Sequence, residues 1–236
     1  MGKVYAGTSG WAYPTWKPDF YPTKLASAKF LGYYASRLNS VELNHTFRRF
    51  PTEKLLTGWI EATPPDFKFA VKAHQTITHI KRLRDAKFTQ DFLSALEPMR
   101  ESGKLGPVLF QLPPFLKCDL PLLKEFLDQL PHTIRAAFEF RHVSWFNDEV
   151  YDLLRGADAA LCQAESEKIE TPEVQTAGFS YLRLRKEDYS EKARAALVRT
   201  VAKRVEEGDM FVYFKHEETA EGALYAEALL AAATKS

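Results

Sequence analysis

The chain has 236 residues, of which 45% are hydrophobic and 27% are charged, and its formal net charge is +1. This length fits one large domain, and we expect a single domain over residues 1–236. A near-neutral charge gives no global field for nucleic acid or a membrane surface, and no apolar stretch approaches the ~18 residues of a membrane span.

The cysteines and the N-terminus bear on the compartment. Cys118 and Cys162 are far apart and show no metal-binding spacing, which is typical of reduced thiols. The chain starts directly in a strand-like run, without the apolar region of a signal peptide. We therefore expect a cytoplasmic protein.

Eight short apolar runs predict β-strands, in chain order. They are Val4–Thr8, Val41–Asn44, Phe67–Lys72, Pro107–Leu112, Ala136–Arg141, Ala159–Glu165, Phe179–Arg185 and Met210–His216. Near-continuous apolar runs are typical of parallel strands that are buried on both faces.

The segments between these runs mostly have helical periodicity. Apolar positions mark helices at residues 30–38, at 55–60 after the candidate N-cap Thr52, at 92–96, at 122–130 from near Asp119, at 148–156 from the candidate cap Asn147 to Gly156, at Ser190–Glu207 and at Ala220–Thr234. The exception is Ser166–Thr176, which shows no helical stripe, and we expect a loop there in place of a sixth helix.

Alternation of strand and helix predicts parallel strands joined by crossover helices. Eight strands favour an α/β fold of the triosephosphate-isomerase type, a parallel eight-stranded (β/α)8 barrel. An open doubly wound sheet is the alternative, but Gly7-Thr8-Ser9-Gly10 is not the glycine-rich turn that such sheets usually carry.

Two connections are long, and both are expected on the face where the strands end. Ser9–Leu25 is rich in aromatic residues, and Ala73–Lys87 is rich in histidine and basic residues. Loops of this length are often functional. The aromatic loop either lines a ligand pocket or forms a hydrophobic plug over the barrel mouth.

Polar residues stand at the ends of the predicted strands. Because strand side chains alternate, each of four pairs shares one face: Glu42 with Asn44, Glu139 with Arg141, Arg183 with Arg185, and Tyr213 with Lys215. The mouth then collects three acids (Glu42, Glu139, Glu165) and five bases (Lys72, Arg141, Arg183, Arg185, Lys215). The surplus of bases predicts an anionic ligand, since arginine suits phosphate and carboxylate. The alternative is a structural salt-bridge layer.

The catalytic candidates are Glu42, Lys72, Glu139 and His142. Lys72 among arginines is expected to have a lowered pKa and to act as a base or a Schiff-base nucleophile, or else as a charged ligand contact. His142 follows a strand end directly. The candidate ligand-binding residues are Trp11, Asn44, His79, Gln111, Arg141, Trp145, Arg183, Arg185 and Lys215.

A divalent metal is the less favoured reading. Its ligands would come from Glu42, His74 or His79, Glu139, His142, Glu165 and His216. No HxH or HExxH spacing concentrates these residues, and five nearby cations oppose a further positive charge. We therefore predict no cofactor.

Several motifs in fixed order resemble the domain of unknown function 72 family. They include Gly7-Thr8-Ser9-Gly10-Trp11, residues 41–47 (VELNHTF), residues 67–72 (FKFAVK), residues 104–114 (KLGPVLFQLPP) and residues 139–142 (EFRH). The resemblance covers about residues 4–230 and implies a barrel of the triosephosphate-isomerase type, without a reaction. Arg48 and the segment from Lys215 to Glu218 depart from the family pattern, so ligand identity need not transfer between relatives.

Two functions of different classes follow. The first is an enzyme acting on a small phosphorylated or carboxylated metabolite. The second is a nucleic-acid-binding or phosphodiester-cleaving protein, supported by the basic residues 81–84 and the aromatic loop. A non-catalytic scaffold is a third reading. The sequence does not indicate an oligomeric state.

Overall fold

The strands of the computed structural model, which describes residues 2–233, form two parallel sheets. Sheet order is β1-β9-β8-β7 in the first and β2-β3-β4-β5-β6 in the second. The strands are β1 (Val4–Thr8), β2 (Ser40–Leu43), β3 (Lys68–Lys72), β4 (Leu105–Gln111), β5 (Ala136–Glu139), β6 (Ala160–Leu161), β7 (Gln163–Ala164), β8 (Phe179–Leu184) and β9 (Asp209–Phe214). The α/β fold with parallel strands is confirmed, whereas the predicted single closed sheet of eight strands is not.

The predicted sixth strand is split at Cys162, and this break separates the two sheets. The Cys162 amide donates to the Phe138 carbonyl of β5, at 2.8 Å. The Leu161 amide donates instead to the Thr176 hydroxyl, at 2.8 Å. The chain therefore passes from β6 in one sheet to β7 in the other within three residues.

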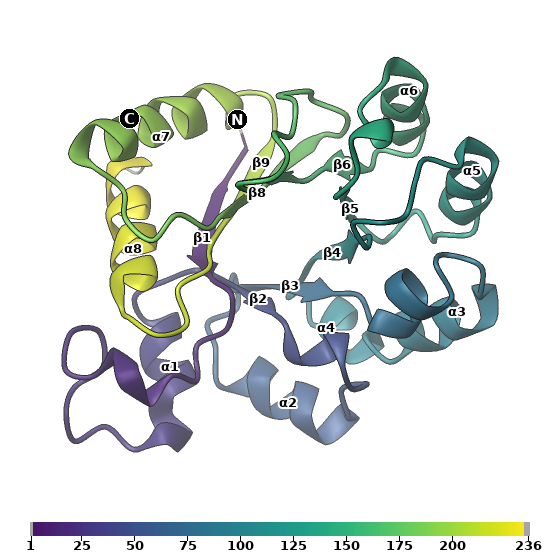
Figure 1. Ribbon diagram of the computed structural model, residues 1–236. Coiled ribbons are helices and arrows are strands. Elements are labelled where there is room, and N and C mark those ends of the chain that lie inside the picture. Colours follow the sequence, from purple (N-terminus) through teal and green to yellow (C-terminus); the bar gives the residue numbers. More distant parts are fainter. Residues whose placement is uncertain (1, 234–236) are drawn as a thin grey trace.

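Side chains replace much of the ladder where β1 meets β2. The Asn39 side chain bonds to Ala6 N and Val4 O, and the Tyr34 hydroxyl bonds to Thr8 N and Ser40 O. A Cβ at Gly7 would lie 1.9 Å from the Ser40 oxygen, so only glycine permits this approach. One isolated parallel bridge, Ser9 to Glu42, joins the two strands. In Figure 1 the strands of both sheets surround a common centre.

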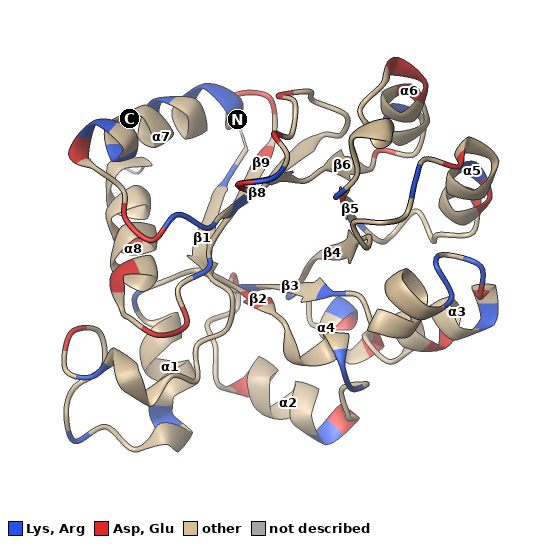
Figure 2. Ribbon diagram, in the orientation of Figure 1, with Lys and Arg blue, Asp and Glu red and all other residues tan. Residues whose placement is uncertain are grey.

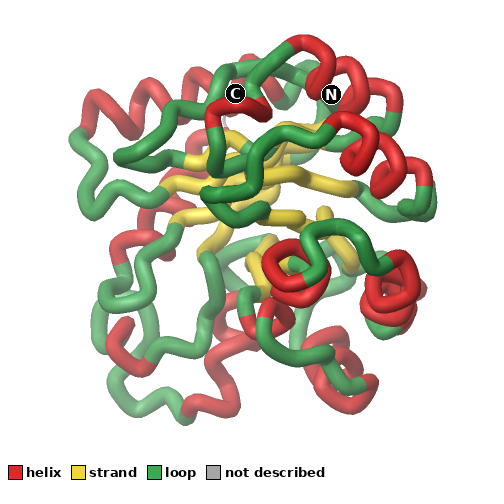
Figure 3. Tube along the Cα trace, turned by 45° about the vertical axis from the view of Figure 1, so that its right-hand side comes forward, coloured by secondary structure: helices red, strands yellow, loops and turns green. Residues whose placement is uncertain are grey.

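The helices lie outside the strands (Figures 1 and 3). They are α1 (Phe30–Ala35), α2 (Glu53–Glu61), α3 (Ala86–Ser94), α4 (Glu97–Glu101), α5 (Leu120–Asp128), α6 (Asp148–Gly156), α7 (Glu191–Arg204) and α8 (Glu221–Ala233). Thr52 and Asn147 each accept a backbone N–H as predicted caps, and Asp119, near which the sequence predicts the start of a helix, caps α5 in the same way. The predicted end of the last helix, Thr234, lies outside the described residues.

The connection between β7 and β8 is a loop, as predicted. Residues 165–178 between β7 and β8 contain no helix, in agreement with the loop expected there. Among the described helices, none has the length and apolar character that would let it cross a membrane.

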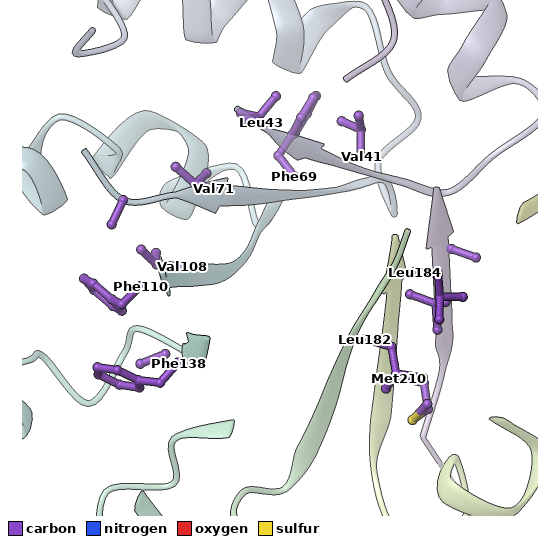
Figure 4. Close-up of a cluster of buried hydrophobic side chains, with 14 of the residues drawn as sticks. Val41, Leu43, Phe69, Val71, Val108, Phe110, Phe138, Leu182, Leu184 and Met210 are labelled. Atoms are coloured by element: carbon purple, nitrogen blue, oxygen red, sulfur yellow. The ribbon is translucent and has the colours of Figure 1, made fainter. Parts of the chain in front are cut away.

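Strand residues alternate between two buried layers. Side chains that face the helices form one apolar cluster, which includes Val41, Val71, Phe110, Phe138 and Leu182 (Figure 4). Their strand neighbours face inward and form a second cluster, which includes Ala70, Leu109, Ala137, Tyr181 and Tyr213. Residues two positions further along a strand point to the same side. The polar residues that follow the inward cluster by two positions therefore form a layer next to it, at the carboxyl ends of the strands.

Candidate functional site

Six polar side chains lie at the carboxyl ends of five strands, above the inward apolar cluster. We call them the inner polar layer: Glu42, Lys72, Gln111, Glu139, Arg183 and Arg185. In the register of β4 with β5, Gln111 is paired with Glu139. The preceding inward-facing pair of these strands is Leu109 and Ala137. Figure 2 shows acidic and basic positions close together near β2 and β3.

Arg183 joins the two carboxylates of the inner polar layer. Its Nη1 lies 2.5 Å from Glu139 Oε2, and its Nη2 lies 2.8 Å from Glu42 Oε1. Arg185 Nη2 reaches Glu139 Oε1 at 2.8 Å. Glu42, Glu139 and Arg183 are almost fully buried. A salt-bridge layer is therefore present, which was the structural alternative for these residues.

Both carboxylates are held ionised by several donors. Glu42 also accepts hydrogen bonds from Ser9 Oγ and the Tyr181 hydroxyl, each at 2.8 Å. Burial raises the pKa of Glu42, but Arg183 and these hydrogen bonds lower it below its ordinary value. For Glu139, burial is again outweighed by Arg183, Arg185 and Gln111, and the pKa falls to about 2. Neither group is suited to take up protons near neutral pH.

Lys72 is the cation of the layer without an acid partner. Its Nζ donates to Gln111 Oε1 at 2.9 Å and lies 4.2 Å from the centre of the Phe47 ring. Among the described residues, no carboxylate oxygen lies within 4.0 Å of it. Burial, followed by the charge of Arg183, lowers the pKa of Lys72 to about 8. At pH 7, Lys72 is therefore a neutral amine in about a tenth of the molecules.

His79 lies near Lys72 on the same Phe47 ring, and Arg141 is near enough to His79 to affect its pKa. The His79 ring contacts the Phe47 ring edge-on at 5.1 Å, and its Nδ1 is 2.9 Å from Thr78 Oγ1. Partial burial, then the charges of Lys72 and Arg141, lower the pKa of His79. Its imidazole is thus neutral at neutral pH. Arg141 is exposed, and among the described residues it has no carboxylate within 4.0 Å.

Asn44 is a second polar group of interest next to Lys72. It follows β2 by one residue, directly beyond the register pair Leu43–Val71. Its Oδ1 is buried and has no hydrogen-bond partner among the described residues. Buried polar atoms are normally hydrogen-bonded, so this oxygen is a candidate acceptor for a ligand N–H or O–H.

Both predicted ligand-binding tryptophans pack against other side chains. Trp145 is fully buried, stacks on Phe140 at 4.6 Å and donates from Nε1 to the Leu116 carbonyl. Its position does not support a ligand contact, because its apolar ring completes the core. Trp11 packs edge-on against Trp59 of α2 at 5.4 Å. Most of the aromatic loop, including Trp16 and Tyr21, belongs to the same core.

The remaining candidates lie outside the inner polar layer. His142 Nδ1 accepts the Ser144 amide and so caps the short turn that follows β5. Glu165 accepts the amides of Arg185 and Lys186 and the Tyr189 hydroxyl, which fixes the connection after β8. Lys215 is exposed, 4.0 Å from Glu217. Glu165 and Lys215 therefore do not join the charge cluster that we predicted at the mouth.

The metal-ligand candidates do not converge. Among residues 2–233, no group of three or more His, Cys, Asp or Glu side chains is placed to hold a metal ion. His216, for example, packs between Tyr189 and Tyr225. Glu42 and Glu139 already have arginine partners.

Two grooves lie elsewhere on the protein. One of about 540 Å³ lies beside α5 and α6, near the beginnings of β5 and β6. Another of about 320 Å³ is lined by apolar residues of α7 and α8. No residue of the inner polar layer lines either groove.

Phe47, Ser9 and Tyr181 were missed as site residues. Phe47 lies two residues after His45, in the turn that follows β2, and its ring contacts both Lys72 and His79. Tyr181 could have been found, because it precedes Arg183 by two positions and so shares its face. Nothing in the sequence indicates that Ser9 reaches Glu42.

Sequence comparison places the chain among proteins without an assigned activity. The family model described as "Protein of unknown function DUF72" matches residues 5–236. UPF0759 protein YunF of Bacillus subtilis (strain 168) is 34% identical over 160 residues, and UPF0759 protein YecE of Escherichia coli (strain K12) is 32% identical over 157 residues. These matches cover 63% and 65% of the chain but 54% of each relative, so the chain spans about half the length of these curated relatives.

Solved structures support the fold. A DUF72 family protein from Thermotoga maritima MSB8 is 27% identical, with a TM-score of 0.84 over 99% of this chain and 100% of that one. An AP endonuclease of family 2 from Brucella melitensis is 10% identical, with a TM-score of 0.56 over 92% and 93% of the two chains. The second likeness is one of fold alone.

Proposed function

The chain belongs to the DUF72 family, and from this premise we propose that it is an enzyme that binds a phosphate- or carboxylate-bearing small molecule at the carboxyl ends of its strands. Lys72 would exchange a proton with that molecule. The family description names no reaction, so the proposal depends on the arrangement of charges around Lys72.

The observation that carries the proposal is an unbalanced charge. Glu42 and Glu139 together hold Arg183 and Arg185, while protonated Lys72 and Arg141 have no acid partner among the described residues. A partly buried cation without a counterion is costly, and an anion beside it offsets that cost. The guanidinium of Arg141 is suited to bind two oxygens of a phosphate or carboxylate.

The proposed roles differ from those of a carboxylate enzyme. Lys72 is the acid or base, and His79, which contacts the same Phe47 ring, is the proposed second group for proton transfer. Arg141, Asn44, Gln111 and Arg185 are the proposed binding residues. Glu42 and Glu139 position the arginines from below, and catalytic roles for these acids and for His142, and a ligand contact for Lys215, stay predictions.

A thermal-shift screen tests this proposal and needs no assumption about the reaction. Ligand binding to the native state raises the melting temperature by mass action. We expect phosphorylated sugars or small carboxylic acids to stabilise the wild type and not Lys72→Met or Arg141→Gln. Lys68→Met, at the opposite end of β3, is the matched control and should respond like the wild type. Equal shifts in all four proteins would contradict the proposal.

A second candidate function is binding of single-stranded nucleic acid. Ile80, Phe115 and Val143 are exposed on the connections that follow β3, β4 and β5, and Arg82 lies 5.1 Å from the Phe115 ring. The exposed Phe115 ring suits a stacked base, and Lys81, Arg82 and Arg84 nearby in the chain suit phosphates. Fluorescence anisotropy with a short oligonucleotide discriminates: this candidate requires binding at about 50 mM salt that falls steeply by about 200 mM.

A cytoplasmic location remains part of the proposal. Both cysteines, Cys118 and Cys162, are free thiols, which fits a reducing compartment.

A further inference from the structure

We propose that Lys72 is a nucleophile, which forms an imine with the carbonyl group of an anionic aldehyde or ketone bound beside Arg141. This inference rests on the proposed function, because the anionic group of the substrate occupies the anion site described there. It adds the class of substrate and a covalent step.

The immediate partner of Lys72 leaves its nitrogen available. Gln111 Oε1 accepts one N–H of Lys72, and a neutral amide holds the ammonium less firmly than a carboxylate does. The side chain of Gln111 also lowers the pKa of Glu139, so its amide lies near that carboxylate as well. The acids that could pair with Lys72 are instead occupied by Arg183 and Arg185. The amine is thus held in place without a strong ion pair.

Two other lysines, Lys104 and Lys68, differ from Lys72 in their hydrogen bonds and in their position along the strands. Lys104 is also buried, but its Nζ donates to Ile60 O at 2.6 Å, Thr63 O at 2.7 Å and Thr63 Oγ1 at 3.0 Å. All three of its N–H groups are therefore in use. Lys68 begins the same strand that Lys72 ends, and it donates to the Gly103 carbonyl. Both lysines lie at the amino ends of the strands, away from Arg141.

The chemistry balances with the groups present. The ammonium of Lys72 first loses a proton, and the lowered pKa makes this loss accessible near neutral pH. The nitrogen lone pair then attacks the carbonyl carbon, and the carbonyl π electrons move to oxygen. The oxygen takes up a proton and the nitrogen loses a second one, which gives a neutral carbinolamine. Water leaves with that oxygen and with the hydrogens that Lys72 gave up, and a protonated imine remains. No oxidant or reductant is needed.

In this proposal His79 carries the proton. Its ring and the Lys72 ammonium contact the same Phe47 ring, at 5.1 and 4.2 Å from the ring centre. Because burial, and then the charges of Lys72 and Arg141, lower the pKa of His79, its neutral imidazole is the proposed acceptor of the proton from the ammonium and returns it to the carbonyl oxygen.

Reductive trapping with pyridoxal 5′-phosphate tests the inference on the wild-type protein. This probe carries an aldehyde and a phosphate, and sodium borohydride reduces its imine to a stable amine. We expect peptide mapping to find the label on Lys72 at least about tenfold above the label on Lys68 at pH 7. Inorganic phosphate should suppress it by competition. Lys72→Arg should lose this label, while Lys68→Arg should keep it.

The outcomes separate the two proposals. Pyridoxal, which lacks the phosphate, should label Lys72 several-fold less than its phosphate ester. Equal labelling by both probes would leave Lys72 reactive but contradict the anion site. Binding of inorganic phosphate without selective labelling of Lys72 would keep the anion site and overturn the nucleophile. Uniform labelling of surface lysines would also overturn it.

Discussion

Lys72 Nζ lies 2.9 Å from Gln111 Oε1, a neutral acceptor whose side chain also lowers the pKa of Glu139. The neighbouring arginines take up the acids, while the lysine receives only a neutral acceptor and an aromatic ring. A cation in this position has a lowered pKa and attracts anions. The lowered pKa and the attraction of anions can each be measured.

The first prediction concerns the pH dependence of stability. The pKa of Lys72 is about 8 in the folded protein, below its ordinary value of 10.5. Between these values the unfolded chain binds more protons, so the wild type gains stability as pH rises. Relative to Lys72→Met, its free energy of unfolding should increase by about 2 kcal/mol between pH 8 and 9.5. Urea denaturation of both proteins across this range measures it, and parallel curves would contradict the lowered pKa.

The second prediction concerns a smaller contribution to that lowered pKa, the charge of Arg185, which acts after burial and Arg183. Arg185→Gln removes a positive charge near Lys72 and frees an oxygen of Glu139. We expect the pKa of Lys72 to rise, by up to about one unit. The pH dependence of reductive methylation at Lys72, followed by mass spectrometry, gives the value. Arg185→Lys keeps the charge and should change the pKa less; a fall in Arg185→Gln would show that another group dominates.

The third prediction tests the buried ion network. Arg183→Met keeps an unbranched chain in place of the aliphatic part of arginine but leaves Glu42 and Glu139 buried without their shared cation. Removing one partner of a buried pair costs about 3–5 kcal/mol of folding stability. Chemical denaturation should show this loss at pH 7. Lys87→Met, which removes an exposed ion pair with Asp91, should change stability little; similar losses in both variants would argue that the network is not buried.

A fourth prediction concerns the junction of β1 and β2. A Cβ at Gly7 would meet the Ser40 backbone oxygen at 1.9 Å, so Gly7→Ala must push the strands apart. We expect a loss of about 3 kcal/mol in the free energy of unfolding. Gly58→Ala in α2 is the matched control, because nothing lies within 4 Å of its Cβ, and it should stabilise the protein by about 0.5–1 kcal/mol. A neutral Gly7→Ala would mean that the strands are not this close.

Much of the inner polar layer could be predicted from spacing. Glu42, Lys72, Gln111, Glu139 and Arg183 fall at the ends of apolar runs, and period two assigns them to one face. Which of these side chains form ion pairs or hydrogen bonds with one another could not be predicted in the same way. Which acid Arg183 bridges depends on how strands far apart in sequence are arranged in space, as does the assignment of Lys72 to Gln111.

The two observed sheets differ from the single closed sheet that we predicted, and the differences have local causes. The sixth run reads as one strand, but Thr176 takes the Leu161 amide and so breaks the ladder beside Cys162. The β1–β2 contact depends on the side chains of Asn39 and Tyr34, which no strand pattern reveals. Trp145 is a ligand-binding candidate from the sequence, yet its indole is fully buried in the core, an orientation that no strand pattern reveals.

Calorimetric titration with inorganic phosphate at pH 7 tests most directly whether Lys72 and Arg141 form an anion site. We predict saturable binding of one phosphate by the wild type and by Lys68→Met, and binding at least about tenfold weaker in Lys72→Met and Arg141→Gln, a difference of about 1.4 kcal/mol or more. Absence of binding to the wild type, or equal affinity in all four proteins, would contradict the account.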